Sequence, residues 1–167
     1  VDGYCWLHRG AFSCSRELCE GRPTRKYIDY CVRLVEMMKS NGVTPLMVFD
    51  GGKLPMKVGE EQARDRSRRE QHEKALGHLR AGNMAAASEC FQRAVDVTPR
   101  MAAAVIAELA KLGVRSIVAP YEADCQMAFL ALHGHVHAIV TEDSDLLVYG
   151  VERVLFKMDH AGHGVEI

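Results

Sequence analysis

The stretch from Val118 to Asp145 constrains the fold of this chain more than any other. It has the pattern of a strand end, a helix and a second apolar strand, Ala138 to Val140, and acidic residues follow each strand. A parallel strand–helix–strand unit brings both carboxyl ends to the same edge of one sheet. Carboxylates gathered there would repel one another without a cation between them. The pattern therefore predicts a divalent-metal site.

The chain of 167 residues has the length of one domain with its own core. Hydrophobic residues at 48% and charged residues at 26% argue against disorder. The net charge of -1 identifies no partner, because a carboxylate-rich site can mask a basic patch in the total. The six cysteines form no CxxC pair, which favours reduced thiols in an intracellular protein. Apolar runs stay short of the ~18 residues of a membrane helix, so we expect no membrane partner.

The two ends of the chain suggest that it is a fragment. It starts at Val1-Asp2 without Met and stops at Ile167 after a strand-like run. Asp2 has the place of the last residue of a strand whose earlier part is missing.

The remaining helices and strands are predicted from the spacing of apolar residues and from the residues that cap or end each element. Helical spacing predicts helices over Tyr4–Leu18, Tyr27–Lys39 with Thr24 as cap, and Met101–Leu112 behind Thr98-Pro99. Short apolar runs predict strands over Pro45–Phe49, Arg115–Ala119 and Arg153–Met158. Lys53 to Pro55 is expected to be a loop. The order of elements predicts an α/β fold with a mainly parallel central sheet flanked by helices.

A long helical insert interrupts this order. A polar helix is expected from about Lys57 to Leu79, and residues 81 to 99 resemble half of a tetratricopeptide repeat. Such repeats need several stacked copies, and one copy favours an inserted helical hairpin. From Lys53 to Arg80 there are eight basic and five acidic residues, a sum of +3. The positive charge is either a solvated helix face with ion pairs or a phosphate-binding surface.

Acidic residues follow four apolar strands, the first of them inferred; they are Asp2, Asp50, Glu122, Asp124, Asp143 and Asp145. A single such residue is more often a helix cap. Four acidic strand ends together, without nearby Cys or His spacing, favour the hard ions Mg²⁺ or Mn²⁺ over zinc. Two such ions could activate a water and stabilise the leaving oxygen of a phosphodiester. The basic groups Lys57, Arg66, Arg68 and Arg69 could then supply countercharge for the phosphates.

Five motifs carry a resemblance to a known family: DxYCWLH from Asp2, FDG from Phe49, RSRRE from Arg66, APYEAD from Ala119 and TEDSDLL from Thr141. Together they resemble the flap endonuclease superfamily of 5′ nucleases, and the CWLH and ECF stretches resemble its exonuclease branch. The resemblance covers essentially the whole chain. It implies a PIN-like nuclease fold with a helical arch or cap at about residues 57 to 97.

The resemblance also implies roles for single residues. The six acidic residues match the family's ligands for two Mg²⁺ ions, which Mn²⁺ could replace. Lys57 and Arg68 match basic residues that contact the scissile phosphate, and Arg66 and Arg69 lie beside them. Tyr4 and His8 match residues next to the attacked DNA end, where a base could stack.

The implied activity is Mg²⁺-dependent 5′→3′ hydrolysis of duplex DNA and cleavage of 5′ flaps. The implied setting is mismatch repair and recombination in the nucleus, on DNA with 5′ ends, nicks or flaps. The family's first strand, its seventh carboxylate and a carboxyl-terminal DNA-binding element, through which mismatch-repair proteins could bind, are missing. Two extra residues lie between Lys57 and Arg68 and shift the register of the basic helix. We therefore expect little activity from this chain alone and an active full-length parent.

Other interpretations remain open at this point. Residues 81 to 99 could belong to a helical-repeat interaction module, and the Asp143/Asp145 pair could serve a phosphatase or a sugar transferase. His133, His135 and His137 are expected at the surface rather than on a metal. Trp6 and Cys125 are expected to pack in the core.

Overall fold

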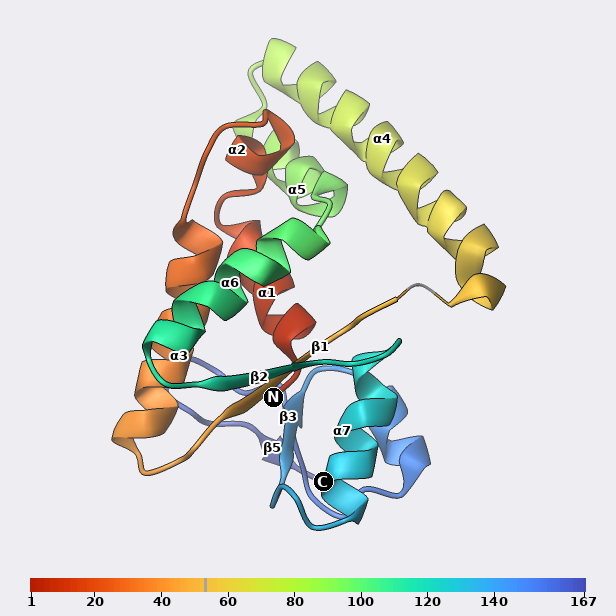
Figure 1. Ribbon diagram of the computed structural model, residues 1–167. Helices are drawn as coiled ribbons and strands as arrows, with labels where there is room; N and C mark the ends of the chain where they lie inside the picture. The colour runs from red at the N-terminus through yellow and green to blue at the C-terminus, as the bar shows by residue number, and fades with distance from the viewer. Residues whose placement is uncertain (53) are drawn as a thin grey trace.

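The computed structural model describes residues 1–52 and 54–167, so Lys53 of the expected loop lies outside the described residues. The helices are α1 Gly3–Phe12, α2 Ser15–Cys19, α3 Lys26–Ser40, α4 Val58–Arg80, α5 Met84–Ala94, α6 Pro99–Lys111 and α7 Ala123–Leu132, with 3₁₀ turns η1 Pro55–Lys57 and η2 Ser144–Tyr149. The strands are β1 Leu46–Phe49, β2 Arg115–Val118, β3 Ile139–Thr141, β4 Val154–Phe156 and β5 Val165–Glu166. Figure 1 shows their arrangement.

The first two residues join two small sheets. β1 pairs in parallel with β2, and β3 pairs in parallel with β4. Between them lies the segment Val1–Asp2: the N–H of Val48 donates to the carbonyl of Val1, and the N–H of Asp2 donates to the carbonyl of Val140, each over 2.9 Å. Across the described residues the resulting order is β2, β1, Val1–Asp2, β3, β4 and β5, and β5 is antiparallel to β4. The prediction of a mainly parallel sheet is confirmed, and Asp2 forms an isolated parallel bridge with Val48 at the place where the sequence predicts a strand end.

Helices cover both faces of this sheet. Successive side chains of a strand point to opposite faces, so β1 contributes to a core on each side. Met47 and Phe49 of β1 belong to a core shared with α1, α3 and α6. Val48, between them, belongs to a second core with Ile139 of β3 and with α7. Figure 1 shows α7 apart from the other helices, across the sheet. Trp6, at 3% exposure, lies in the first core as expected.

The predicted helix from Tyr4 to Leu18 is wrong in one respect, because it is two helices. α1 ends at Phe12, and the hydroxyl of Ser13 donates to the carbonyl of Gly10 over 2.9 Å. A serine side chain that bonds to the preceding turn competes with helix propagation. Thr24 is also not the residue that directly caps α3, since its hydroxyl accepts from Lys26 and Arg25 takes the N-cap position. Thr98, in contrast, caps α6 as predicted, accepting from Met101 over 3.3 Å.

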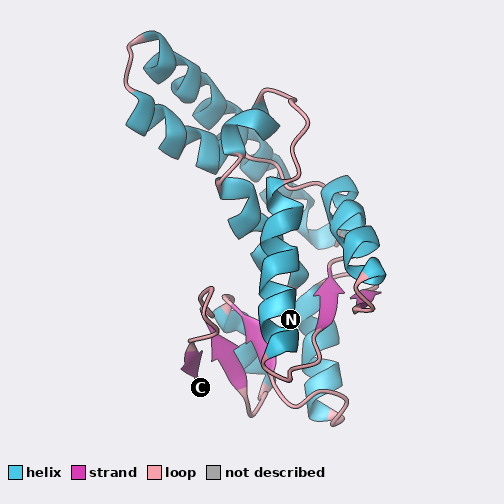
Figure 2. Cartoon of the chain, turned by 90° about the vertical axis from the view of Figure 1, so that its left-hand side faces the viewer, coloured by secondary structure: helices cyan, strands magenta, loops and turns pink. Residues whose placement is uncertain are grey.

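The inserted helices form a hairpin. α4 buries only Ala75, which packs with Ala87 and Phe91 of α5 in a small separate core. Cys19 of α2 lies against that core, so the hairpin rests on α2 rather than on a second repeat. Figure 2 shows the hairpin projecting from the body of the molecule. Among the helices that the structure describes, none is both long enough and apolar enough to span a bilayer.

Candidate active site

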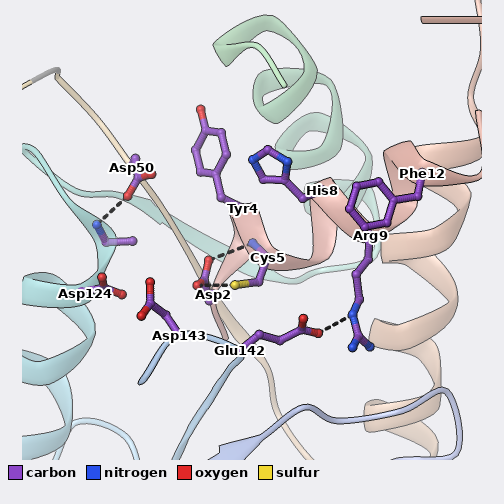
Figure 3. A pocket seen from close by; sticks show the side chains of 11 residues that line it. Asp2, Tyr4, Cys5, His8, Arg9, Phe12, Asp50, Asp124, Glu142 and Asp143 are labelled. Carbon is purple, nitrogen blue, oxygen red and sulfur yellow. Dashed lines mark hydrogen bonds and ion pairs between the residues drawn. The ribbon is translucent and has the colours of Figure 1, made fainter. Parts of the chain in front are cut away.

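A pocket of about 270 Å³ opens at the carboxyl ends of the strands. Four of the six predicted carboxylates line it, namely Asp2, Asp50, Asp124 and Asp143, each on a different segment of the chain (Figure 3). The other lining residues are Tyr4, Cys5, His8, Arg9, Phe12, Ala123 and Glu142. The fold therefore brings together acids that are up to 141 residues apart in sequence, as the strand-end pattern predicts.

Asp2 is buried at 7% exposure and is held by three donors. Its Oδ1 accepts from the N–H of Cys5 over 3.1 Å, which caps α1. Its Oδ2 accepts from the Cys5 thiol over 2.8 Å and from the Thr141 hydroxyl over 3.1 Å. Burial, and then the charge of Asp2, raises the pKa of Cys5 to about 12, so the thiol stays protonated as a donor. Helix capping and a place in the pocket are thus both properties of Asp2.

Asp50 and Asp143 also combine a local cap with a place in the pocket. Oδ1 of Asp50 accepts from the N–H of Ala123 over 2.7 Å, at the first residue of α7. Oδ1 of Asp143 accepts from the N–H of Asp145 over 3.0 Å, at the start of η2. Each of these bonds uses one carboxylate oxygen, so the capping interpretation does not compete with a ligand role.

Asp124 is affected both by burial and by the neighbouring carboxylates. Burial raises its pKa to about 6, and the charges of Asp2, Asp143, Asp50 and Asp145 add to this in that order. The pKa of Asp50 is raised too, first by desolvation, while its hydrogen bond from Ala123 opposes the shift. A cation in the pocket would stabilise the ionised form of these carboxyl groups.

Glu122 and Asp145 do not line the pocket. The carboxylate of Glu122 forms an ion pair with Lys57. Asp145 is exposed, although its charge reaches Asp124. Over residues 1–52 and 54–167, no three His, Cys, Asp or Glu side chains lie close enough to hold a metal ion by themselves. Mg²⁺ does not require such a cage, because it keeps several waters and takes one or two carboxylates together with substrate phosphates.

The basic residues of α4 are only partly gathered at the pocket. Arg68 is ion-paired with Asp65, one turn away, and with Asp96 over 3.3 Å. Desolvation lowers the pKa of His8, whereas the negative charge of Asp2 raises it. The positive charge of Arg68 also lowers this pKa, so Arg68 lies within electrostatic reach of α1. Arg66 and Arg69 are exposed on α4. The ion-paired, solvated helix face considered from the sequence is therefore present on this segment.

One face of α1 forms the wall of the pocket. Tyr4, His8 and Phe12 follow one another at intervals of four residues, and Tyr4 packs edge-on against Phe49 with 6.0 Å between ring centroids. Sequence reasoning missed Phe12, although its helical spacing from His8 was a usable signal. It also missed the ion pair between Arg9 and Glu142, in which Glu142 directly precedes Asp143.

The expectation for Cys125 is wrong, whereas the expectation for His133 and His135 is confirmed. Cys125 was expected in the core, but it is exposed and its thiol lies 3.2 Å from the Tyr149 hydroxyl. It lines an apolar groove of about 440 Å³ together with Glu122, whereas the buried face of α7 carries Ala123, Met127 and Ala128. His133 and His135 are exposed, as expected, and contact the ring of Phe129.

Two family profiles match this chain. The XPG N-terminal domain matches residues 1–72, and the XPG I-region matches residues 113–166. The first contains Asp2 and Asp50, and the second contains the four remaining acidic residues. The unmatched interval contains α5 and α6.

Curated relatives from plants, animals and fungi match nearly the whole chain. The chain is 55% identical to exonuclease 1 of Arabidopsis thaliana over 99% of its length, and 48% identical to exonuclease 1 of Danio rerio over all of it. It is 39% identical to the DNA damage-inducible protein DIN7 of Saccharomyces cerevisiae. The chain spans 23% and 21% of the first two proteins and 39% of the third.

Solved structures share the fold. The catalytic core of Rad2 in complex with DNA substrate is 25% identical, with a TM-score of 0.65 over 100% of this chain and 44% of that one. Flap endonuclease-1 from Methanococcus jannaschii is 26% identical, with a TM-score of 0.54 over 93% of this chain and 52% of that one.

Proposed function

The chain belongs to the flap endonuclease superfamily of 5′ nucleases, and we propose that it carries the catalytic centre of a metal-dependent DNA 5′ nuclease. The observation that carries this proposal is the pocket in which Asp2, Asp50, Asp124 and Asp143 meet from four separate segments. A single chemistry, the binding of hard cations next to phosphate, explains why four acids occupy one pocket.

We propose that two Mg²⁺ ions, or Mn²⁺ in their place, are held by Asp2, Asp50, Asp124 and Asp143 together with Glu122 and Asp145. All of the donors are carboxylate oxygens, and four of the six acids line one pocket, so the residues fit a hard cation. When bound, such ions would activate a water and stabilise the leaving oxygen of a phosphodiester. Glu122 would take part only after it separates from Lys57.

The remaining residues would bind and orient the DNA. Lys57 and Arg68 would contact the scissile phosphate, which requires them to leave their present carboxylate partners. Arg66 and Arg69 would hold neighbouring phosphates from the exposed face of α4. Tyr4 and His8, on the pocket wall, would stack against a base at the attacked end. The hairpin α4–α5, within residues 57 to 97, would form the arch that admits the 5′ end.

The substrate proposal rests on the relatives. A Rad2 catalytic core is in complex with DNA substrate, and the relatives in Arabidopsis thaliana and Danio rerio are named exonuclease 1. We infer that the full-length protein removes nucleotides from 5′ ends at duplex ends and nicks and cleaves 5′ flaps. Its proposed place is the nucleus, in mismatch repair and recombination, with mismatch-repair proteins as further partners.

Substituting Asp143 by Ala in the full-length protein tests this proposal. Cleavage of 5′-labelled duplex and flap DNA in Mg²⁺ should fall at least about 100-fold, the scale of losing one preorganised electrostatic contact. Asp29→Ala, an exposed acid on α3, is the matched control and should cleave like the parent. Undiminished Mg²⁺-dependent cleavage by Asp143→Ala would remove the pocket from the mechanism.

A further inference from the structure

Thr141 is a buried polar residue next to the proposed metal pocket. It ends β3, and at 2% exposure it is more deeply buried than Asp2. Its hydroxyl does not line the pocket but lies between two residues that do, Asp2 and Asp143. A buried hydroxyl in such a place needs partners for both its proton and its lone pairs.

Chemistry fixes the direction of the two hydrogen bonds that join the Thr141 hydroxyl to Asp143 and Asp2. The backbone N–H of Asp143 can only donate, so over 3.1 Å the Thr141 oxygen accepts. The single hydroxyl proton then goes to Oδ2 of Asp2, also over 3.1 Å, because a carboxylate only accepts. The Thr141 hydroxyl therefore connects the carboxylate of Asp2, beside β1, with the backbone of Asp143, whose carboxylate also lines the pocket.

These bonds decide which oxygen of Asp2 is available. A carboxylate oxygen has about two acceptor positions. Oδ2 uses both, for Thr141 and for the thiol of Cys5, whereas Oδ1 accepts only from the N–H of Cys5. Oδ1 thus keeps a position for a ligand, and the orientation of the carboxylate is set by its neighbours.

We propose that Thr141 is a positioning residue that holds Asp2 and Asp143 in a fixed relation for cation binding. This inference rests on the proposed function, since it assigns Thr141 a role toward the same pocket. A merely structural threonine would stabilise β3 and leave metal affinity unchanged. A positioning threonine sets metal affinity, and losing such a supporting partner typically reduces it about 10-fold to 100-fold.

The test compares three variants in the full-length protein. Thr141→Val keeps the shape and strand preference but removes the hydroxyl, Thr141→Ser keeps the hydroxyl, and Thr98→Val removes the capping hydroxyl of α6 as a control outside the pocket. Mn²⁺ binding without DNA is measured by electron paramagnetic resonance. The Mg²⁺ concentration for half-maximal cleavage, kcat and KM are measured separately, and thermal unfolding reports on the fold.

Thr141→Val is expected to weaken Mn²⁺ binding and to raise the half-maximal Mg²⁺ concentration, each about tenfold, with KM for DNA unchanged. Thr141→Ser and Thr98→Val should stay within about twofold of the parent in both measurements, because both keep the hydroxyl at position 141. Unchanged Mn²⁺ affinity in Thr141→Val overturns the inference, whether or not kcat falls. If Asp143→Ala abolishes cleavage while Thr141→Val behaves like the parent, the inference fails and the proposed function stands. If Asp143→Ala remains active, the proposed function itself fails.

Discussion

Lys57 at the start of the helical hairpin forms an ion pair with Glu122, which immediately precedes α7. The pair connects the insert to the strand-end edge of the sheet, beside the carboxylate pocket. Lys57 is a proposed phosphate contact and Glu122 a proposed metal ligand, and in this structure each neutralises the other. Binding of DNA and metal would therefore exchange partners at both residues, which links the position of the hairpin to occupation of the site.

Replacing Lys57 by Met should separate these two roles. Cleavage should fall at least about tenfold, because a charge-assisted contact to the phosphate is lost. Mn²⁺ binding without DNA should strengthen by up to about fivefold, because the exposed ion pair that engages Glu122 is lost. Lys74→Met, farther along α4, should change neither quantity. Full activity in Lys57→Met would remove the phosphate role.

Arg66 and Arg69 should bind phosphates without reading sequence. Changing both to Gln should weaken DNA binding uniformly and reduce the slope of log K against log[salt] by roughly 1.8, for two lost phosphate contacts. Fluorescence anisotropy between low and moderate salt measures the slope. The same pair of changes at Arg33 and Arg100, exposed on α3 and α6, serves as control. An unaltered slope would place the DNA away from this face of α4.

The pKa of Asp124 predicts how stability depends on pH. Because the folded state raises it from 3.8 to about 6, the folded chain holds the proton more tightly than the unfolded chain. The stabilising contribution is complete below about pH 4 and is lost as pH rises through 6. Without metal, Asp124→Asn should therefore be more stable than the parent at pH 7.5, by about 1 kcal/mol after allowance for solvent screening.

Urea unfolding at pH 5 and pH 7.5 in chelator checks this prediction. The advantage of the Asn variant should be smaller at pH 5, and Mn²⁺ should stabilise the parent but not the variant. A variant that is less stable than the parent at both values would contradict the account of charge repulsion in the pocket.

Two glycines provide a test of the fold around the site. A Cβ on Gly51 would overlap the carbonyl oxygen of Ala119, just where β1 and β2 end, so Gly51→Ala should destabilise by at least about 2 kcal/mol. Gly59 in α4 has open space around it, so Gly59→Ala should be neutral or stabilising by up to about 1 kcal/mol. Thermal unfolding of both variants checks the contrast. Equal effects would mean that the close approach at Gly51 is absent.

The strand-end acids were predictable because their signal is local. An apolar run followed by Asp is visible without the fold, and the parallel topology then places Asp2, Asp50, Asp124 and Asp143 in one pocket. Glu122 has the same local signal, but its carboxylate turns to Lys57, a partner 65 residues away that no local pattern identifies.

The missed features depend on contacts distant in sequence. Thr141 acquires its place from Asp2, 139 residues away, and looks like an ordinary strand residue in the sequence. β5 was indicated only as a strand-like run before Ile167 and not counted among the elements, because its two residues acquire strand character by pairing with β4. The break between α1 and α2 comes from one side-chain bond of Ser13 within an otherwise helical spacing.

The most direct test of the central claim is cleavage of 5′-labelled duplex and flap DNA by the full-length protein, measured in Mg²⁺ and in EDTA beside the 167-residue chain. The account predicts release of nucleotides from the 5′ end by the full-length protein in Mg²⁺, complete loss in EDTA, and little or no cleavage by the 167-residue chain. Cleavage by the full-length protein that persists in EDTA would contradict a metal centre built from these carboxylates.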